Sequence, residues 1–187
     1  MSRLATTLLA ATVAWAGAPM ARASEAMAAP APASAPREGR LACGDATLTA
    51  STRLTEVADH DRQVLAQGIT LVAPGHPDPV TLKLDARRLR QPFLQGVDVL
   101  DASATGWACV KSASGKAYVY VMMTCTESPK RPACAGDTRE WVRLYDTRGR
   151  ALNAGYPHGG SRTPALLKRL GLGGVLADGV SLADLAD

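Results

Sequence analysis

Apolar and polar residues alternate one by one over several short stretches of the chain. A period of two is typical of a β-strand that buries one of its two faces. The alternation occurs at 45–52, 68–73, 79–85, 96–103, 106–110 and 140–145. We therefore expect a mainly β fold, in which antiparallel strands form a sandwich or a barrel, with an α+β fold as the alternative.

One further stretch, Ala117–Cys125, is apolar on both of its faces. One face would carry Val119, Val121, Met123 and Cys125, and the other Tyr118, Tyr120 and Met122. A strand that is apolar on both sides is usually covered on both sides, so we expect it at the centre of a sheet.

Two stretches predict turns between these strands. PGHPDP (74–79) contains three prolines and one glycine, which predicts a wide hairpin loop. DTRG (146–149) predicts the turn of a second hairpin, in which the strand at 140–145 is followed by Ala151 and Leu152.

The clearest helix is predicted in RTPALLKRLGLGG, at residues 162–174. Thr163 is suited to cap the helix, Pro164 to occupy its first position and Gly171 to end it. The apolar face would then consist of Leu166, Leu167 and Leu170. The tail SLADLAD (181–187), with Ser181 as its cap, is too short to be stable as an isolated helix.

Residues Thr55–Gln67 fit two structures. Thr55 could cap a helix in which Val57, Val64 and Leu65 share one side, and this is the interpretation that we favour. The alternative is that QVLAQ (63–67) extends the strand that follows it.

The N-terminal segment has the pattern of an export signal. Arg3 precedes an apolar stretch, and ARA (21–23) supplies the small residues around a cleavage site. We therefore predict a signal peptide at 1–23, an Ala/Pro-rich disordered leader at 24–39 and one domain at 40–187. No other stretch is long and apolar enough to predict a membrane span. The expected location is periplasmic or secreted.

Four cysteines follow this signal, and an even number of cysteines in an oxidising compartment predicts disulfides. The short spacing of Cys125 and Cys134, with two prolines between them, favours a closed loop and would leave Cys43 to pair with Cys109. The other two connectivities remain open. No cysteine pair has the spacing of a structural zinc site, and we predict no metal site.

The charge of the chain argues against two classes of partner. Loss of Arg3 and Arg22 with the signal lowers the formal net charge from +4 to +2, too little to attract nucleic acid or anionic lipid by itself. Basic residues do gather in ARRLR (86–90) and PKR (129–131), which we interpret as solvated faces or turns.

No catalytic motif stands out, and we assign no catalytic residue and no cofactor. The sequence lacks a G-x-S-x-G elbow, an H-E-x-x-H pair and a glycine-rich phosphate loop. His60 lies between Asp59 and Asp61, but neighbouring side chains point apart in a strand and diverge in a helix. His76 and His158 lie in predicted loops.

The polar loop KSASGK (111–116) lies before the apolar strand. Its residues Ser112–Tyr118, SASGKAY, resemble the Ser-Gly-x-x-Tyr motif of the periplasmic and membrane-bound inhibitors of C-type lysozyme, which are small exported β-barrels with a disulfide. By this resemblance Ser114 would enter the carboxylate-lined cleft of a lysozyme, and Tyr118 would begin the supporting strand. The second motif of that family, a lysine and a glycine after a tryptophan, is absent, since VRLYDTRG follows Trp141.

These observations together predict an exported protein-binding module of the inhibitor or immunity type. Its binding residues would be Ser114, Lys116, Lys111 and Tyr118, in polar loops opposite the disulfides. The first alternative is an envelope hydrolase that uses His60 with a distant carboxylate. The second is a non-catalytic structural protein of the envelope.

Overall fold

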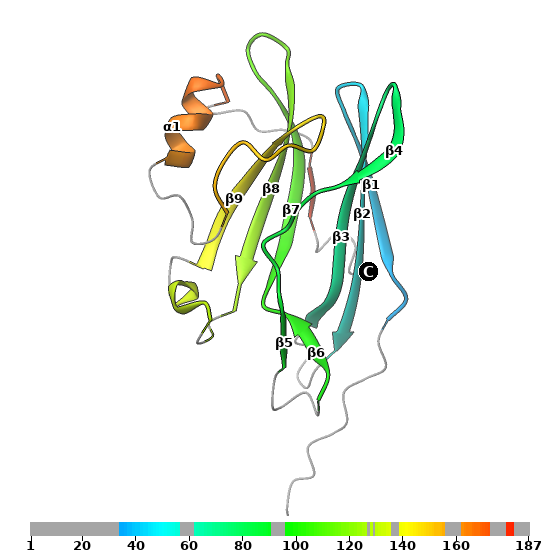
Figure 1. Cartoon of the computed structure of the whole chain (residues 1–187), viewed down its shortest axis with the longest axis vertical. Helices are drawn as coiled ribbons and strands as arrows, with labels where there is room; N and C mark the ends of the chain where they lie inside the picture. The colour runs from blue at the N-terminus through cyan, green and yellow to red at the C-terminus, as the bar shows by residue number, and fades with distance from the viewer. Residues whose placement is uncertain are drawn as a thin grey trace, which may run out of the picture.

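The computed structural model describes residues 34–56, 62–90, 96–126, 128, 130–135, 139–155, 162–172 and 179–181. These residues form a mainly β fold, as the alternating pattern predicts. Two four-stranded antiparallel sheets pack face to face, and a two-stranded ribbon lies at one end (Figure 1). Within the described residues the strands form a sandwich and do not close into a barrel.

The first sheet is a run of consecutive hairpins. It contains β1 (Arg37–Cys43), β2 (Ala46–Glu56), β3 (Arg62–Ala73) and β4 (His76–Thr81), in the order β1-β2-β3-β4. The ribbon that follows consists of β5 (Arg88–Arg90) and β6 (Asp98–Leu100). β1 begins three residues before the domain boundary that we predict at Arg40.

The second sheet has the order β10-β7-β8-β9. Its strands are β7 (Ala102–Lys111), β8 (Ala117–Cys125), β9 (Glu140–Asp146) and β10 (Gly179–Ser181). The strand that is apolar on both faces, β8, is paired on both sides, which confirms its predicted central position. A 3-10 helix, η3 (Pro132–Cys134), and the single α-helix, α1 (Arg162–Arg169), complete the described elements.

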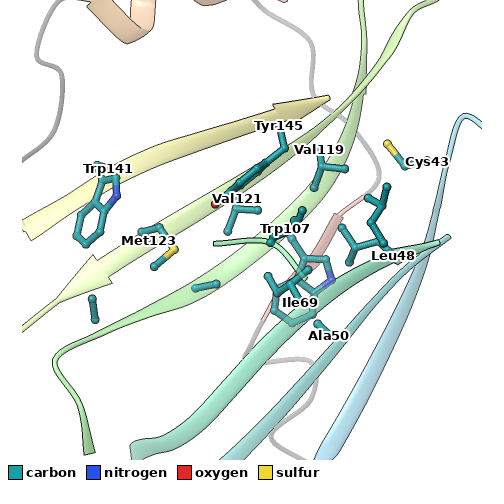
Figure 2. Packing of buried hydrophobic residues seen from close by; sticks show 14 of the residues in the cluster. Cys43, Leu48, Ala50, Ile69, Trp107, Val119, Val121, Met123, Trp141 and Tyr145 are labelled. Atoms are coloured by element: carbon teal, nitrogen blue, oxygen red, sulfur yellow. The ribbon is translucent and has the colours of Figure 1, made fainter. Parts of the chain in front are cut away.

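The main core lies between the two sheets, where every second residue of each strand points inward. Leu48, Ala50 and Ile69 come from the first sheet, and Trp107, Val119, Val121 and Tyr145 come from the second (Figure 2). Burial of one such side chain contributes roughly 1.5–3 kcal/mol to folding. The period-two pattern therefore determines which faces of the sheets meet.

A smaller apolar cluster joins α1 to the outer face of the second sheet. Val110, Tyr118 and Leu144 of the sheet pack against Leu166 and Leu172 of the helical segment. α1 covers only part of this face, since Met122 of β8 keeps 42% of its surface exposed.

The ends of α1 differ from each other in how well they match the prediction. Thr163 lies inside the helix, which begins at Arg162, and its hydroxyl oxygen accepts a hydrogen bond from the Asn153 side-chain amide at 3.2 Å. At the other end Gly171 has a φ of 69° and ends the helix as predicted. The amide of Leu172 donates to the carbonyl of Leu167 across this turn.

The disulfides have the predicted pairing. Cys43 is bonded to Cys109 with a Cα–Cα distance of 5.1 Å, and Cys125 to Cys134 with 5.7 Å. The first bond connects β1 to β7, and therefore connects the two sheets. Because Cys109 is near the end of β7 that leads into the polar loop, our expectation that the loop lies opposite the disulfides is wrong for this one. Two disulfides indicate an oxidising compartment.

The helix that we favour at 55–67 is wrong for the residues that the structure describes. Thr55 lies in β2, and Arg62–Gln67 belong to β3. Residues 57–61, which include His60, lie outside the described residues. The register of β2 and β3 shifts between Arg53 and Leu54, where Arg53 pairs with Ala66 and Leu54 with Val64. Leu65 therefore has no paired residue on β2, and β3 forms a β-bulge at this position.

Two smaller expectations also change. PGHPDP is not a wide loop, because Pro74 and Gly75 form a tight turn and β4 starts at His76. Prolines 77 and 79 are accommodated because β4 is an edge strand. Ser181 ends β10 and is not a helix cap, and the tail after it lies outside the described residues.

In the part of the chain that is described, no helix combines the length and the apolar character needed to cross a bilayer.

Candidate functional site

The candidate site is the loop that joins β7 to β8, at one end of the sandwich (Figure 1). Lys111 pairs with Ala117 as the last rung of the two strands, and residues 112–116 form the loop beyond it. Ala113, Ser114, Gly115 and Lys116 are exposed. The loop therefore presents a short polar surface directly above a paired hairpin.

Local hydrogen bonds fix the shape of this loop. The amide of Ser112 donates to the carbonyl of Lys116 at 2.9 Å, and the amide of Gly115 donates to the carbonyl of Ser112 at 2.8 Å. Gly115 has a φ of 80°, a conformation that favours glycine. All of these hydrogen bonds are formed within the loop itself.

Two serine hydroxyls take part in the same loop. The hydroxyl oxygen of Ser112 accepts a hydrogen bond from the amide of Lys116 at 3.2 Å. The hydroxyls of Ser112 and Ser114 lie 2.9 Å apart and share a hydrogen bond. Ser112 is half-buried and Ser114 is exposed, so this bond ties the exposed hydroxyl to the base of the loop.

The base of the loop is held on one side by the first sheet. The Cys43–Cys109 disulfide attaches β7 to β1 two residues before Lys111. The turn after β1 adds a close contact, since a Cβ at Gly44 would lie 3.0 Å from the Cβ of Ala117. The hairpin cannot move away from the first sheet without breaking this covalent bond.

The other side of the loop meets the end of α1. A Cβ at Gly171 would lie 3.7 Å from the amide nitrogen of Ala113, so the turn that ends α1 approaches the loop backbone. Leu172 follows Gly171 and is buried in the cluster under α1. The loop is thus supported from two directions by residues that are far away in the sequence.

The four predicted binding residues do not have equal access to solvent. Lys111, Ser114 and Lys116 are exposed, whereas Tyr118 is buried beneath α1. The ammonium of Lys116 lies 5.6 Å from the centre of the Tyr118 ring. Tyr118 can therefore orient Lys116 through a cation–π contact, but its own ring is part of the packing.

Positive charge gathers around the loop. Lys111 and Lys116 belong to the loop hairpin, and Lys168 and Arg169 are exposed in the last turn of α1. We call these four residues the basic end. The neighbouring turn after β1 adds one exposed carboxylate, Asp45. Within the described residues, none of the four cations is bound to a carboxylate.

The sequence interpretation missed a buried ion pair near the opposite end of β7. Nε of Arg131 donates to Oδ2 of Asp101 at 2.6 Å, and each side chain is 3% exposed. Arg131 also donates to the carbonyl of Asp85, and Oδ1 of Asp101 accepts from the amide of Arg87 at 2.8 Å. The PKR cluster is therefore only in part the solvated turn that we expected, since Lys130 is exposed and Arg131 is not.

A second set of polar contacts connects the segment 82–87 to β9. Nε of Arg143 lies 3.6 Å from Oδ2 of Asp85, and the hydroxyl of Tyr145 donates to the carbonyl of Lys83 at 2.7 Å. Burial raises the pKa of Tyr145, and the nearby Arg143 counteracts this in part. These groups bond to one another inside the fold, so we interpret them as structural.

The histidines do not form a site in the described residues. His76 is exposed in β4, and His60 and His158 lie outside the residues that the structure describes. The described part of the chain also has no group of three or more His, Cys, Asp or Glu side chains arranged to hold a metal ion.

The chain was compared with protein-family models, with curated proteins and with solved structures. None of them matches it. The function of the chain is therefore inferred from the geometry of the loop and its surroundings.

Proposed function

We propose that this protein is an exported binding module that recognises a carboxylate-rich site on another protein through the loop Lys111–Lys116. The observation that carries the proposal is the contrast between the loop and its base. Ser114 and Lys116 are exposed, while the base of the loop is fixed by the Cys43–Cys109 disulfide and by the end of α1. A preorganised loop loses little conformational entropy when it binds.

The basic end supplies the charge complementarity for such a partner. Its four cations are exposed and lie on two segments that meet where Gly171 approaches Ala113. Exposed charges of one sign accelerate the encounter with a partner of opposite sign, and salt weakens this effect. We therefore expect binding that weakens as the ionic strength rises.

Two independent features support an exported location. The disulfides require oxidising conditions, and the N-terminal residues have the pattern of an export signal. The periplasm or the extracellular medium would satisfy both. A rigid module with an exposed polar loop is suited to an inhibitor or immunity protein in these places.

The Ser-Gly-x-x-Tyr resemblance suggests a specific probe, a C-type lysozyme. A lysozyme cleft carries two catalytic carboxylates, and Ser114 and Lys116 would be the groups that enter it. Tyr118 would act as a support, since it is buried under α1. The barrel of those inhibitors is replaced here by an open sandwich, so the likeness concerns the loop alone.

The first experiment measures binding to a purified C-type lysozyme by calorimetry, together with inhibition of its lytic activity. We expect binding by the wild-type protein and a loss of at least tenfold in affinity for the Ser114→Ala/Lys116→Ala variant. Lys130→Ala is the matched control, because Lys130 is exposed in a different loop, near η3. Its affinity should equal that of the wild type.

The second experiment uses the same three proteins as bait in envelope extract, at low and high salt. Capture of a protein that depends on Ser114 and Lys116 and falls with salt would support the binding module even if lysozyme does not bind. The proposal would be refuted if the wild type and both variants captured the same protein equally. It would also be refuted if neither experiment showed binding that depends on Ser114 and Lys116.

A further inference from the structure

The sandwich has four outer strand edges, and they are not equally protected. An unpaired strand edge offers backbone amides and carbonyls to any other strand, and folded proteins usually block such edges. β4 carries Pro77 and Pro79, and its pairing with β3 is irregular. β10 is only three residues long.

The edge of β9 is covered by the chain that follows it. The amide of Leu152 donates to the carbonyl of Leu144 at 2.8 Å. The Asn153 side chain then accepts from the amide of Leu144 and donates to the carbonyl of Val142. Asn153 thus takes the place of a further strand along this edge.

β1 has none of these protections. Its seven residues, Arg37–Cys43, pair regularly with β2, contain no proline and show no shift in register. β10 lies near β1 but is paired with β7 in the other sheet. Among the described residues, no strand pairs with the outer edge of β1, which forms one border of the molecule in Figure 1.

The hairpin geometry shows which residues face outward along this edge. The two-residue turn Gly44–Asp45 makes Cys43 and Ala46 a hydrogen-bonded pair. Hydrogen-bonded and non-hydrogen-bonded pairs alternate in an antiparallel ladder, so the backbone groups of Ala42, Arg40 and Glu38 point away from β2. The side chains of the same three residues are exposed.

We propose that β1 pairs with β1 of a second copy of this chain, so that two first sheets join into one continuous sheet. The exposed charges make the edge complementary to itself. Antiparallel pairing about Gly39 brings Glu38 of each copy opposite Arg40 of the other. In the two neighbouring registers the pairing is centred on Arg40 or on Glu38 instead of Gly39. These registers would place two Arg40 or two Glu38 side chains directly opposite each other, which is unfavourable.

Neither charge is engaged elsewhere in the described part of the chain. Glu38 and Arg40 have no ion-pair partner there, and their neighbours on β2 are Ser51 and Thr49. The two charges are therefore free to form two ion pairs across the new interface. The same register forms two hydrogen-bonded backbone pairs, Glu38 with Arg40 and Arg40 with Glu38.

The resulting dimer is weak, because a single strand edge buries less surface than a standard protein interface. Dissociation constants in the micromolar range or weaker are typical of interfaces below about 1,200 Å². The edge also differs from the loop of the proposed binding function, so the two proposals can be tested separately. Variants at Ser114 and Lys116 should dimerise like the wild type.

Sedimentation equilibrium of the oxidised protein over increasing concentration tests this proposal. We expect a reversible monomer–dimer equilibrium for the wild type. Arg40→Glu should weaken dimerisation at least tenfold, because it places carboxylates opposite each other at two positions. Glu38→Arg should do the same with two pairs of guanidinium groups.

The double variant Glu38→Arg/Arg40→Glu is the decisive measurement, because it exchanges the two charges and restores opposite signs across the interface. It should recover the dimer, whereas a variant that only damages the fold would not. Arg53→Glu is the matched control, since Arg53 is exposed on the inner strand β2, and it should leave the equilibrium unchanged. A wild type that stays monomeric, or a double variant no better than the single ones, would overturn the proposal.

Discussion

The two ends of the β7–β8 hairpin use charged side chains in different ways. At the loop end, Lys111 and Lys116 are exposed and have no carboxylate partner among the described residues. At the other end, Arg131 is buried and bonded to Asp101 at 2.6 Å. The charges of the first end are available to another molecule, and those of the second are satisfied inside the fold.

The two ends of the hairpin also differ in the contacts that hold them in place. The loop end closes through its own hydrogen bonds, so its surface residues can change without loss of contacts elsewhere. The other end depends on contacts between distant segments, since Asp101 bonds to Arg87 and to Arg131. We therefore expect substitutions to affect binding at the first end and stability at the second.

The largest effect should come from Arg131→Ala. Removal of one partner leaves the carboxylate of Asp101 buried without its counter-charge, which typically costs about 3–5 kcal/mol. Urea denaturation should report this loss in the free energy of unfolding. Lys116→Ala, at the loop end, should change the free energy of unfolding by less than about 0.5 kcal/mol.

A second variant separates the charge from the packing. Arg131→Met combined with Asp101→Asn removes both charges, while the amide oxygen can still accept from the amide of Arg87. It should be more stable than Arg131→Met alone, because no uncompensated buried charge remains. Equal stability of the single and double variants would show that the ion pair is not what holds this end together.

The two disulfides allow a second comparison of the ends. Cys43 and Cys109 enclose a longer loop than Cys125 and Cys134, with sequence separations of 66 and 9. In the chain-entropy model their removal costs about 4 kcal/mol and about 2.5 kcal/mol, respectively. Denaturation of the Cys43→Ala/Cys109→Ala and Cys125→Ala/Cys134→Ala variants should show this order.

Binding should distinguish the two disulfides more sharply than stability does. Only the Cys43–Cys109 bond lies at the base of the loop, so its removal should weaken loop-dependent capture at temperatures where both variants remain folded. Loss of the Cys125–Cys134 bond should leave capture close to that of the wild type. If both losses weaken capture equally, the loop is not held by the nearer bond.

Much of the fold could be predicted from the sequence because its strands bury one face each. The alternation at 45–52 and 68–73 corresponds to β2 and β3, and the double apolar face of Ala117–Cys125 placed β8 at the centre. The failure at 55–67 has a physical cause. A β-bulge at Leu65 puts two consecutive buried residues, Val64 and Leu65, in one strand, and such a pair also fits the face of a helix.

The candidate site was predictable only in part. Composition and spacing were enough to indicate an exposed polar loop, but the contact between Ala113 and Gly171 depends on tertiary packing. The buried ion pair left one signal in the sequence, since Asp101 follows Val97 and Val99 on a strand face that is otherwise apolar. A carboxylate in such a position requires a partner, but the sequence does not show that Arg131 supplies it.

A smaller effect on stability than those of Arg131 and the disulfides concerns Tyr145, a polar group inside the main core. Its hydroxyl donates to the carbonyl of Lys83, and Tyr145→Phe should cost about 1 kcal/mol of stability through loss of this bond. Burial raises the pKa of Tyr145 in the folded state, so the unfolded chain loses the phenol proton first as the pH rises. The contribution is therefore complete below about pH 10 and is lost above it.

Urea denaturation near pH 8 and above pH 10 would measure this dependence. The wild type should lose more stability between the two conditions than Tyr145→Phe, which cannot ionise at this position. Tyr120, whose pKa is also raised by burial, is present in both proteins and contributes equally to each. An identical alkaline loss in both proteins would mean that the hydroxyl of Tyr145 is not held in a buried position, and the polar contacts of the core would then resemble the solvated ones at the loop.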